Sequence, residues 1–140
     1  MSHLLFSDSW MQELAKFWNS DQTIEKALAG QKFDAKIGYG FTHALSPAGI
    51  LIIRHNKVQD AGLYQAQSLD WDLRAEVEDW QSWLEEGLGL ARLGFAVAHN
   101  KLQFKTGDYR QMLRTPTLAT AFLRSFELMG HITTEFTAYF

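Results

Sequence analysis

Between Ala75 and Arg114 the chain reads AEVEDWQSWLEEGLGLARLGFAVAHNKLQFKTGDYRQMLR, and this stretch is the most informative part of the sequence about the fold. Trp80, Trp83 and Leu84 stand at positions i, i+3 and i+4, which predicts an amphipathic helix with one apolar side. Gly87 stands where such a helix ends, because glycine readily adopts the conformation that closes a helix.

The second half of the stretch predicts a helix, a strand and a turn. Residues 88–98 are apolar at nearly every position, so we expect a buried helix. Lys101 to Thr106 alternates between polar and apolar side chains, which predicts a short strand. Gly107 and Asp108 break this strand, and Asp108 with Gln111 has the spacing of a helix capping box.

Upstream of this stretch, two helices and four strands are expected. Trp10, Leu14 and Trp18 lie on one apolar stripe of a first helix, and Asp21 caps a short second helix. Alternating or continuously apolar runs predict strands at 33–42, 50–53, from about 58 onward, and 69–77.

Downstream, the sequence predicts one long helix and an aromatic tail. Thr115 caps the helix and Pro116 takes its first position, where a missing N–H has no cost. Its apolar stripe consists of Leu118, Phe122, Phe126 and Met129. Ile132 to Phe140 follows as a further amphipathic segment.

These elements fit a single domain that spans residues 1–140. Strands that follow one another in hairpins, with helices before and after, indicate the α+β class. We expect about five strands in a mainly antiparallel sheet, with four to five helices packed on one face.

Composition excludes several classes of function. The chain has no Cys, which excludes disulfides, thiolate nucleophiles and Cys-based zinc sites. It has 13 basic and 16 acidic residues and no basic run, so we expect no nucleic-acid binding and no binding to anionic membranes through a polybasic patch. The longest apolar stretch, residues 88–98, is far shorter than the roughly 20 residues that a membrane span needs, so we expect no stable membrane insertion. The first residues lack the pattern of a signal peptide, and we expect a cytoplasmic protein.

The sequence shows no arrangement typical of catalysis or metal binding. No two of the five His have helical zinc spacing, and phosphate-loop, dinucleotide-binding and nucleophile-elbow motifs are missing. The alternation in 69–77 predicts a solvated face, formed by Asp70, Asp72, Arg74 and Glu76. Three cations fit either surface charge or a ligand's carboxylate or phosphate: Lys105, Arg110 and Arg114. We expect no catalytic residue, no metal and no cofactor.

The stretch from Ala75 to Arg114 resembles the sterol carrier protein type-two domain. Members of that family typically have an acidic-Trp helix ending in Gly, a further helix, and a Gly-Lys-apolar-x-apolar-x-Gly-Asp strand and turn. The resemblance extends more loosely over residues 8 to 130. Asn100 replaces the usual glycine before Lys101 and tolerates the same left-handed turn. Two further departures are the glycines Gly38 and Gly40 and a C-terminus without the peroxisomal signal of eukaryotic members.

The resemblance implies an apolar tunnel between the sheet and the helices. Such a tunnel takes fatty acyl chains, sterols or similar lipids by burial alone, without a catalytic group. By position on that fold, the residues expected to line it are Trp83, Leu84, Leu90, Phe95, Phe104, Met112, Phe122, Phe126 and Met129.

Three functions stay open at this point. A carrier of an apolar small molecule (a fatty acyl chain, acyl-CoA, or a sterol-like or quinone-like lipid) predicts an internal cavity. A protein–protein interaction or accessory module of a lipid-metabolising system predicts an exposed apolar patch, with the tail 132–140 contacting a partner or forming a homodimer. An enzyme that uses Asp70 or His55 predicts a titratable group with a shifted pKa in a cleft.

Overall fold

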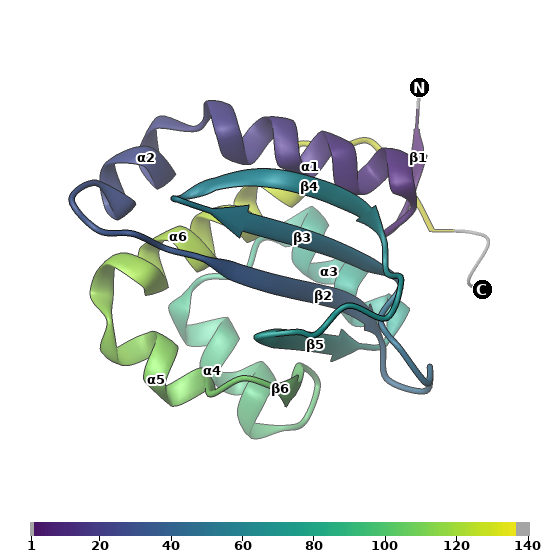
Figure 1. Cartoon of the computed structure of the whole chain (residues 1–140). Coiled ribbons are helices and arrows are strands. Elements are labelled where there is room, and N and C mark those ends of the chain that lie inside the picture. Colours follow the sequence, from purple (N-terminus) through teal and green to yellow (C-terminus); the bar gives the residue numbers. More distant parts are fainter. Residues whose placement is uncertain (1, 137–140) are drawn as a thin grey trace.

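A five-stranded sheet forms one layer of the molecule, and the computed structural model describes residues 2–136. The strands are β2 (Ala35–Phe41), β3 (Gly49–Arg54), β4 (Lys57–Leu63), β5 (Trp71–Ala75) and β6 (Gln103–Thr106). They lie in the order β4-β3-β2-β5-β6 (Figure 1). The β2–β5 pair is parallel and the other three neighbouring pairs are antiparallel. The expected mainly antiparallel α+β sheet is confirmed.

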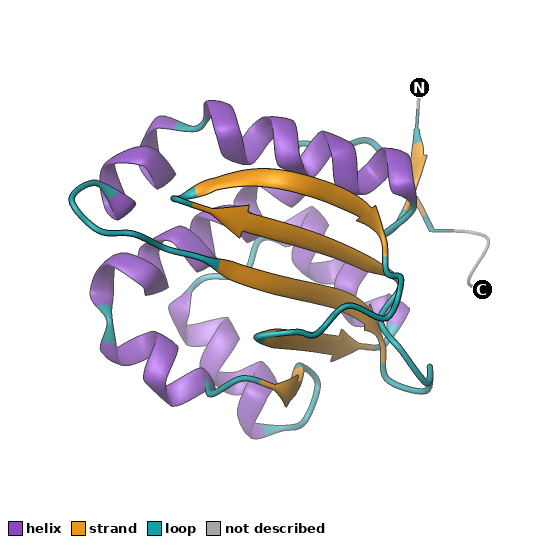
Figure 2. Cartoon of the chain, viewed as in Figure 1, coloured by secondary structure: helices purple, strands orange, loops and turns teal. Residues whose placement is uncertain are grey.

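Helices form the second layer, on one side of the sheet, while loops cross the other side (Figure 2). The described residues form α1 (Asp8–Ser20), α2 (Gln22–Leu28), α3 (Val77–Glu86), α4 (Leu90–Ala98), α5 (Tyr109–Arg114) and α6 (Pro116–Met129). This is six helices where four to five were expected. The residue before a proline is driven out of the helical region, and Thr115 is extended, so α5 and α6 are separate.

The two ends of the described chain meet in a small parallel sheet. It pairs β1 (His3–Leu4) with β7 (Thr134–Glu135). The indole Nε1 of Trp10 donates a hydrogen bond to Thr134 Oγ1 at 2.9 Å, and Ile132 is buried. The first part of the aromatic tail therefore packs on its own chain. Residues 137–140, including Tyr139 and Phe140, lie outside the described residues, and their expected role as a contact stays a prediction.

Large aromatic side chains fill the space between the layers at the β1 end. Phe6, Trp10, Tyr39, Trp80 and Phe126 are each at most 1% exposed. The Phe6 ring meets the rings of Trp10 and Trp80 edge-on, with centroids 5.2 and 5.0 Å apart. Because such pairs combine large buried area with favourable ring geometry, this cluster anchors the helical layer on the sheet.

The prediction that Asp70, Asp72, Arg74 and Glu76 share a solvated face is wrong for Asp72 and Arg74. Both are buried, at 7% and 4% exposed, and they form a two-pronged ion pair with contacts of 2.6 and 3.1 Å. The loop after β2 folds over this face, and Arg74 Nη1 donates to the carbonyl oxygen of Ala44 at 2.9 Å.

Gly38 and Gly40 allow this loop to lie flat on the sheet. A Cβ atom on either glycine would come within 2.9 Å of Pro47. A larger residue at either position would therefore push the loop away from the buried ion pair.

The expected burial of residues 88–98 is also wrong in part. In α4 only Leu93 and Ala96 are buried, while Leu90 and Phe95 are 58% and 55% exposed. The helix lies at the β6 margin of the structure (Figure 1). One of its sides packs on the core, and no element within residues 2–136 covers Leu90 and Phe95.

No helix within residues 2–136 is both long enough and apolar enough to cross a lipid bilayer.

Candidate ligand-binding site

An apolar pocket lies between the two layers. One wall comes from the sheet and the other from α1, α5 and α6. Its lining residues are Trp18, Phe33, Ile37, Trp71, Met112, Leu118, Ala121, Phe122 and Ser125.

Local structure explains why these side chains converge. Ile37 of β2 and Trp71 of β5 are direct partners across the parallel strand pair, so they stand side by side on the sheet. Leu118, Phe122 and Ser125 follow one another at helical spacing on α6, which places them on one face of that helix.

The pocket carries no ionisable group. Its one polar side chain is Ser125, which is 1% exposed and whose hydroxyl donates to the carbonyl oxygen of Phe122 at 2.6 Å. That hydrogen bond satisfies the buried hydroxyl within its own helix. The pocket therefore offers a ligand apolar contact and no acid, base or nucleophile.

The pocket is nearly filled by its own side chains. Its free volume is about 20 Å³, enough for one water molecule. Sites for small molecules are typically on the order of 300–1,000 Å³. A lipid therefore enters only if lining side chains move, and Met112 is suited to this because its unbranched thioether side chain is flexible.

The nine residues expected to line a tunnel fall into three groups. Met112 and Phe122 line the pocket, and the Phe104 ring lies 6.2 Å from Phe122. Four are buried in the filled core beyond it: Trp83, Leu84, Phe126 and Met129. Leu90 and Phe95 are more than half exposed. For all nine residues, contact with a ligand stays a prediction.

Seven of the nine pocket residues were not predicted from the sequence: Trp18, Phe33, Ile37, Trp71, Leu118, Ala121 and Ser125. The alternation of polar and apolar residues in both strands correctly predicts that Ile37 and Trp71 face the helices. What was missing was the knowledge that β2 and β5, which are separated by a hairpin in the sequence, are neighbours. Leu118 had been assigned to the apolar stripe of α6 and could have been included.

A second, open hollow lies between α3 and α4. It is lined by Asp79, Ser82, Trp83, Ala91, Arg92, Phe95, Ala96 and Lys101. Burial raises the pKa of the Asp79 carboxyl, and the charge of Lys101 acts in the opposite direction. Asp70 and His55, the residues of the enzyme hypothesis, line neither this hollow nor the apolar pocket. No cluster of three or more His, Asp or Glu suited to a metal occurs in the described part of the chain.

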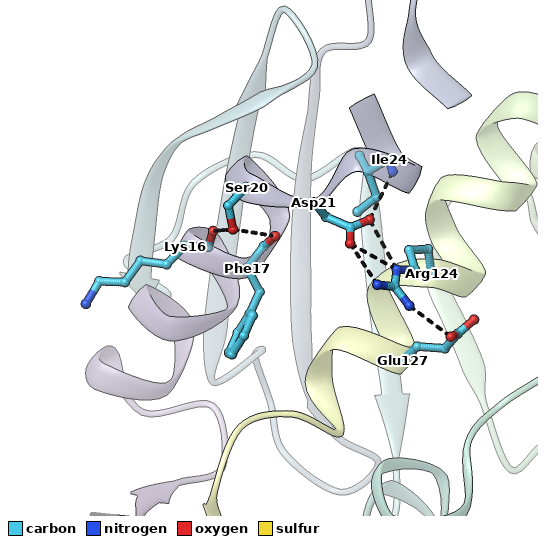
Figure 3. Close-up of polar contacts among 7 residues, drawn as sticks. All are labelled: Lys16, Phe17, Ser20, Asp21, Ile24, Arg124 and Glu127. Atoms are coloured by element: carbon cyan, nitrogen blue, oxygen red, sulfur yellow. Dashed lines mark hydrogen bonds and ion pairs between the residues drawn. The ribbon is translucent and has the colours of Figure 1, made fainter. Parts of the chain in front are cut away.

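An ion pair fixes the pocket-bearing helix α6 against the junction of α1 and α2 (Figure 3). Arg124 donates to both carboxylate oxygens of Asp21, with distances of 2.8 to 3.1 Å. Asp21 also caps α2 by accepting from the backbone N–H of Ile24 at 3.0 Å. Arg124 reaches Glu127 as well, at 3.0 Å. The hydrogen bonds from Arg124 hold the pKa of the Asp21 carboxyl below its usual 3.8, although burial opposes them.

The Asp21–Arg124 pair predicts a loss of stability in acid. A carboxyl whose pKa is lowered by folding stabilises the folded state above its unfolded pKa, and this stabilisation disappears as the pH falls through the folded pKa. Asp21→Asn keeps a capping oxygen but removes the charge. We expect it to lower the free energy of unfolding at pH 7 by about 1–3 kcal/mol, and to lose less stability than the wild type below about pH 4.

Urea unfolding at a series of pH values measures this effect. Glu127→Gln is the matched control, because Glu127 touches the same arginine but its side chain is 58% exposed. We expect that variant to change stability by less than about 1 kcal/mol. An Asp21→Asn protein with the same acid profile as the wild type contradicts the assignment.

The arrangement of sheet and helices is shared with known structures. The chain is similar to a crystal structure of sterol carrier protein 2, with 18% identity, a TM-score of 0.72, and coverage of 91% of this chain and 98% of that chain. It is similar to a conserved Thermus thermophilus protein described as a candidate sterol carrier protein, with 17% identity, a TM-score of 0.72, and coverage of 96% and 94%.

A third similar structure is a UbiJ-SCP2 ubiquinone synthesis protein, with 13% identity, a TM-score of 0.58, and coverage of 88% of this chain and 89% of that chain. The chain therefore has the fold of a sterol carrier protein type-two domain, as the stretch from Ala75 to Arg114 indicated. No protein-family profile and no curated protein sequence matches the chain.

Proposed function

We propose that this protein binds and carries one apolar small molecule in the pocket between the sheet and helices α5 and α6, without chemistry of its own. The observation that carries the proposal is the lining of that pocket, in which eight apolar residues surround a single, internally satisfied Ser125. Candidate ligands are fatty acyl chains, acyl-CoA, and sterol-like or quinone-like lipids. The cytoplasmic location and the absence of a cofactor stay predictions.

Burial supplies the affinity in such a site. Each methylene removed from water contributes about 0.8 kcal/mol, so a long acyl chain outweighs a moderate cost of moving side chains. The ligand must first displace lining residues, and α5 is the element best placed to yield. It has only six residues, of which Met112 alone is fully buried.

The names of the similar structures support the same class of ligand. One is described as sterol carrier protein 2, the second as a candidate sterol carrier protein and the third as a ubiquinone synthesis protein. Sterols and quinones are both apolar molecules, which is the chemistry that the pocket lining fits.

Ala121→Leu tests the proposal by filling the pocket from α6. Ala121 is fully buried and its side chain lines the pocket. We expect the variant to bind a fluorescent fatty acid at least tenfold more weakly than the wild type, because the added atoms take the space that the acyl chain needs. Overpacking is expected to cost about 1–3 kcal/mol of stability, so the variant stays folded.

Titration with cis-parinaric acid, read by fluorescence, measures the affinity. Thr120→Leu is the control, since it adds the same side chain to an exposed position of α6. A wild type that takes up no probe, or an Ala121→Leu protein that binds as well as Thr120→Leu, refutes the assignment of this pocket.

A further inference from the structure

The apolar pocket has no partner for a polar head group. Its lining contains no ionisable side chain, and its one hydroxyl, on Ser125, is already hydrogen-bonded within α6. Burying a charged or strongly polar group without a partner is costly. An amphiphilic ligand with its tail in this pocket must therefore leave its head group at a mouth, where the pocket reaches the surface.

An open hollow lies at the end of the molecule where α4, β6 and α5 come together (Figure 1). We call it the β6–α5 hollow, and its lining includes Val97, Phe104, Lys105, Tyr109 and Arg110. Its free volume is about 710 Å³, and sites for small molecules are typically on the order of 300–1,000 Å³. The hollow therefore has room for a head group and the start of a chain.

The side chain of Phe104 separates this hollow from the apolar pocket. Its ring lies 5.9 Å from the ring of Trp71 and 6.2 Å from that of Phe122, and both of these residues line the pocket. On its other side the ring lies 5.7 Å from that of Tyr109, which lines the hollow. Phe104 is only partly buried and belongs to a four-residue strand at the edge of the sheet. A change of this one side chain therefore joins the two spaces.

The β6–α5 hollow contains two uncompensated cations. Lys105 and Arg110 are exposed, and their side chains form no ion pair with any of residues 2–136. The hollow also contains Asp108, but its carboxylate accepts from the backbone N–H of Arg110 at 2.9 Å and lies 3.9 Å from Arg114. The sequence left open whether these cations are surface charge or contact a ligand. Their shared hollow beside the pocket favours ligand contact.

We propose that the β6–α5 hollow is the mouth of the apolar pocket and holds the anionic head group of a single-chain amphiphile. The tail lies in the pocket, the ring of Phe104 turns aside to let it pass, and Lys105 and Arg110 bind a carboxylate or phosphate. The inference rests on the proposed function, because it needs the apolar pocket, and it narrows the class of ligand. A neutral sterol would leave both cations without a partner.

Binding of cis-parinaric acid and of its uncharged methyl ester tests the head-group contact. The full chain is titrated with each probe at pH 8 and low ionic strength, where charges are least screened. Two exposed ion contacts together contribute roughly fivefold in affinity, so we expect the wild type to prefer the acid by about that factor. We expect Lys105→Gln/Arg110→Gln to lose this preference, because its affinity for the acid falls.

The matched control is Lys26→Gln/Lys32→Gln, which removes two exposed lysines elsewhere on the surface. It is expected to keep the wild-type preference for the acid. The proposal is overturned if the wild type binds both probes equally, or if Lys105→Gln/Arg110→Gln prefers the acid as strongly as the control does. In either case the apolar pocket stands and only its mouth is rejected. If neither probe binds, the proposed function fails as well.

Displacement of bound cis-parinaric acid identifies the kind of anion. Hexadecanoate and hexadecyl phosphate carry the same chain with a carboxylate or a phosphate, and hexadecanol carries it with a neutral hydroxyl. We expect at least one of the two anions to displace the probe at a lower concentration than hexadecanol, and the stronger anion names the head group. Equal displacement by all three compounds overturns the proposal.

The rate of uptake tests the position of the mouth. Phe104→Leu keeps an apolar side chain on β6 but removes the ring between pocket and hollow, so we expect stopped-flow mixing with the methyl ester to show uptake several-fold faster than in the wild type. Phe17→Leu is the control, because Phe17 is also a partly buried aromatic residue packed on the core but lines neither space. If both variants take up the ester at the wild-type rate, the ligand does not pass Phe104 and the proposal is overturned.

Discussion

Trp80→Ala is expected to lower the free energy of unfolding by about 3–5 kcal/mol, the range for removing a large buried aromatic residue. Trp80 is fully buried and its indole N–H donates to the carbonyl oxygen of Gly40 at 2.9 Å, which joins α3 to β2. Its ring stacks on Phe126 of α6, with centroids 6.0 Å apart. The substitution therefore leaves a cavity and removes this hydrogen bond where three elements meet.

Urea unfolding followed by far-UV circular dichroism measures this loss. Phe95→Ala is the control, because it also removes an aromatic ring but from an exposed position. We expect the control to lose less than about 1 kcal/mol. If Trp80→Ala were no less stable than Phe95→Ala, the aromatic cluster would not be what holds the helices on the sheet.

Arg74→Met is expected to lose about 3–5 kcal/mol, because removing one partner of a buried ion pair leaves the other charge without compensation. Asp72 would remain buried under the loop after β2 with its two hydrogen bonds from Arg74 missing. The carbonyl oxygens of Phe41 and Ala44 would also lose their hydrogen bonds from Arg74, so the loop itself is expected to loosen.

The double variant Asp72→Leu/Arg74→Met separates the two parts of this effect. It removes the stranded charge but does not restore the hydrogen bonds from Arg74 to the loop, so we expect it to be more stable than Arg74→Met alone. Thermal unfolding of the two variants and the wild type at pH 7 provides the comparison. A double variant less stable than Arg74→Met would contradict the view that an isolated carboxylate dominates the loss.

Local patterns in the sequence were enough to predict most elements of this fold. The alternation in 33–42 and 69–77 marks β2 and β5, and the spacing of Trp80, Trp83 and Leu84 marks α3. These signals are local because side chains return to the same face of a helix every 3.6 residues and of a strand every two residues, so a short stretch of sequence shows the pattern. The order of strands is not local, and nothing in the sequence indicated that β2 pairs with β5 in parallel.

The same distinction explains the outcome at the site. Met112 and Phe122 were predicted from the stretch around α5 and α6, and both line the pocket. Ile37 and Trp71 were missed because their proximity depends on the strand order. The exposure predicted for Arg74 was wrong for a related reason. The alternation of residues in a strand indicates which side chains face the helices, but it does not indicate that a loop covers the opposite face and buries Arg74 there.

Native mass spectrometry of the freshly purified full chain tests most directly whether the protein holds one apolar molecule between its layers. The mass should exceed that of the polypeptide by one bound molecule, which organic extraction then identifies as a lipid. The same spectrum reports whether the chain is a monomer or a dimer. A bare mass, together with no uptake of fluorescent fatty acids or sterols by the purified protein, would contradict the claim.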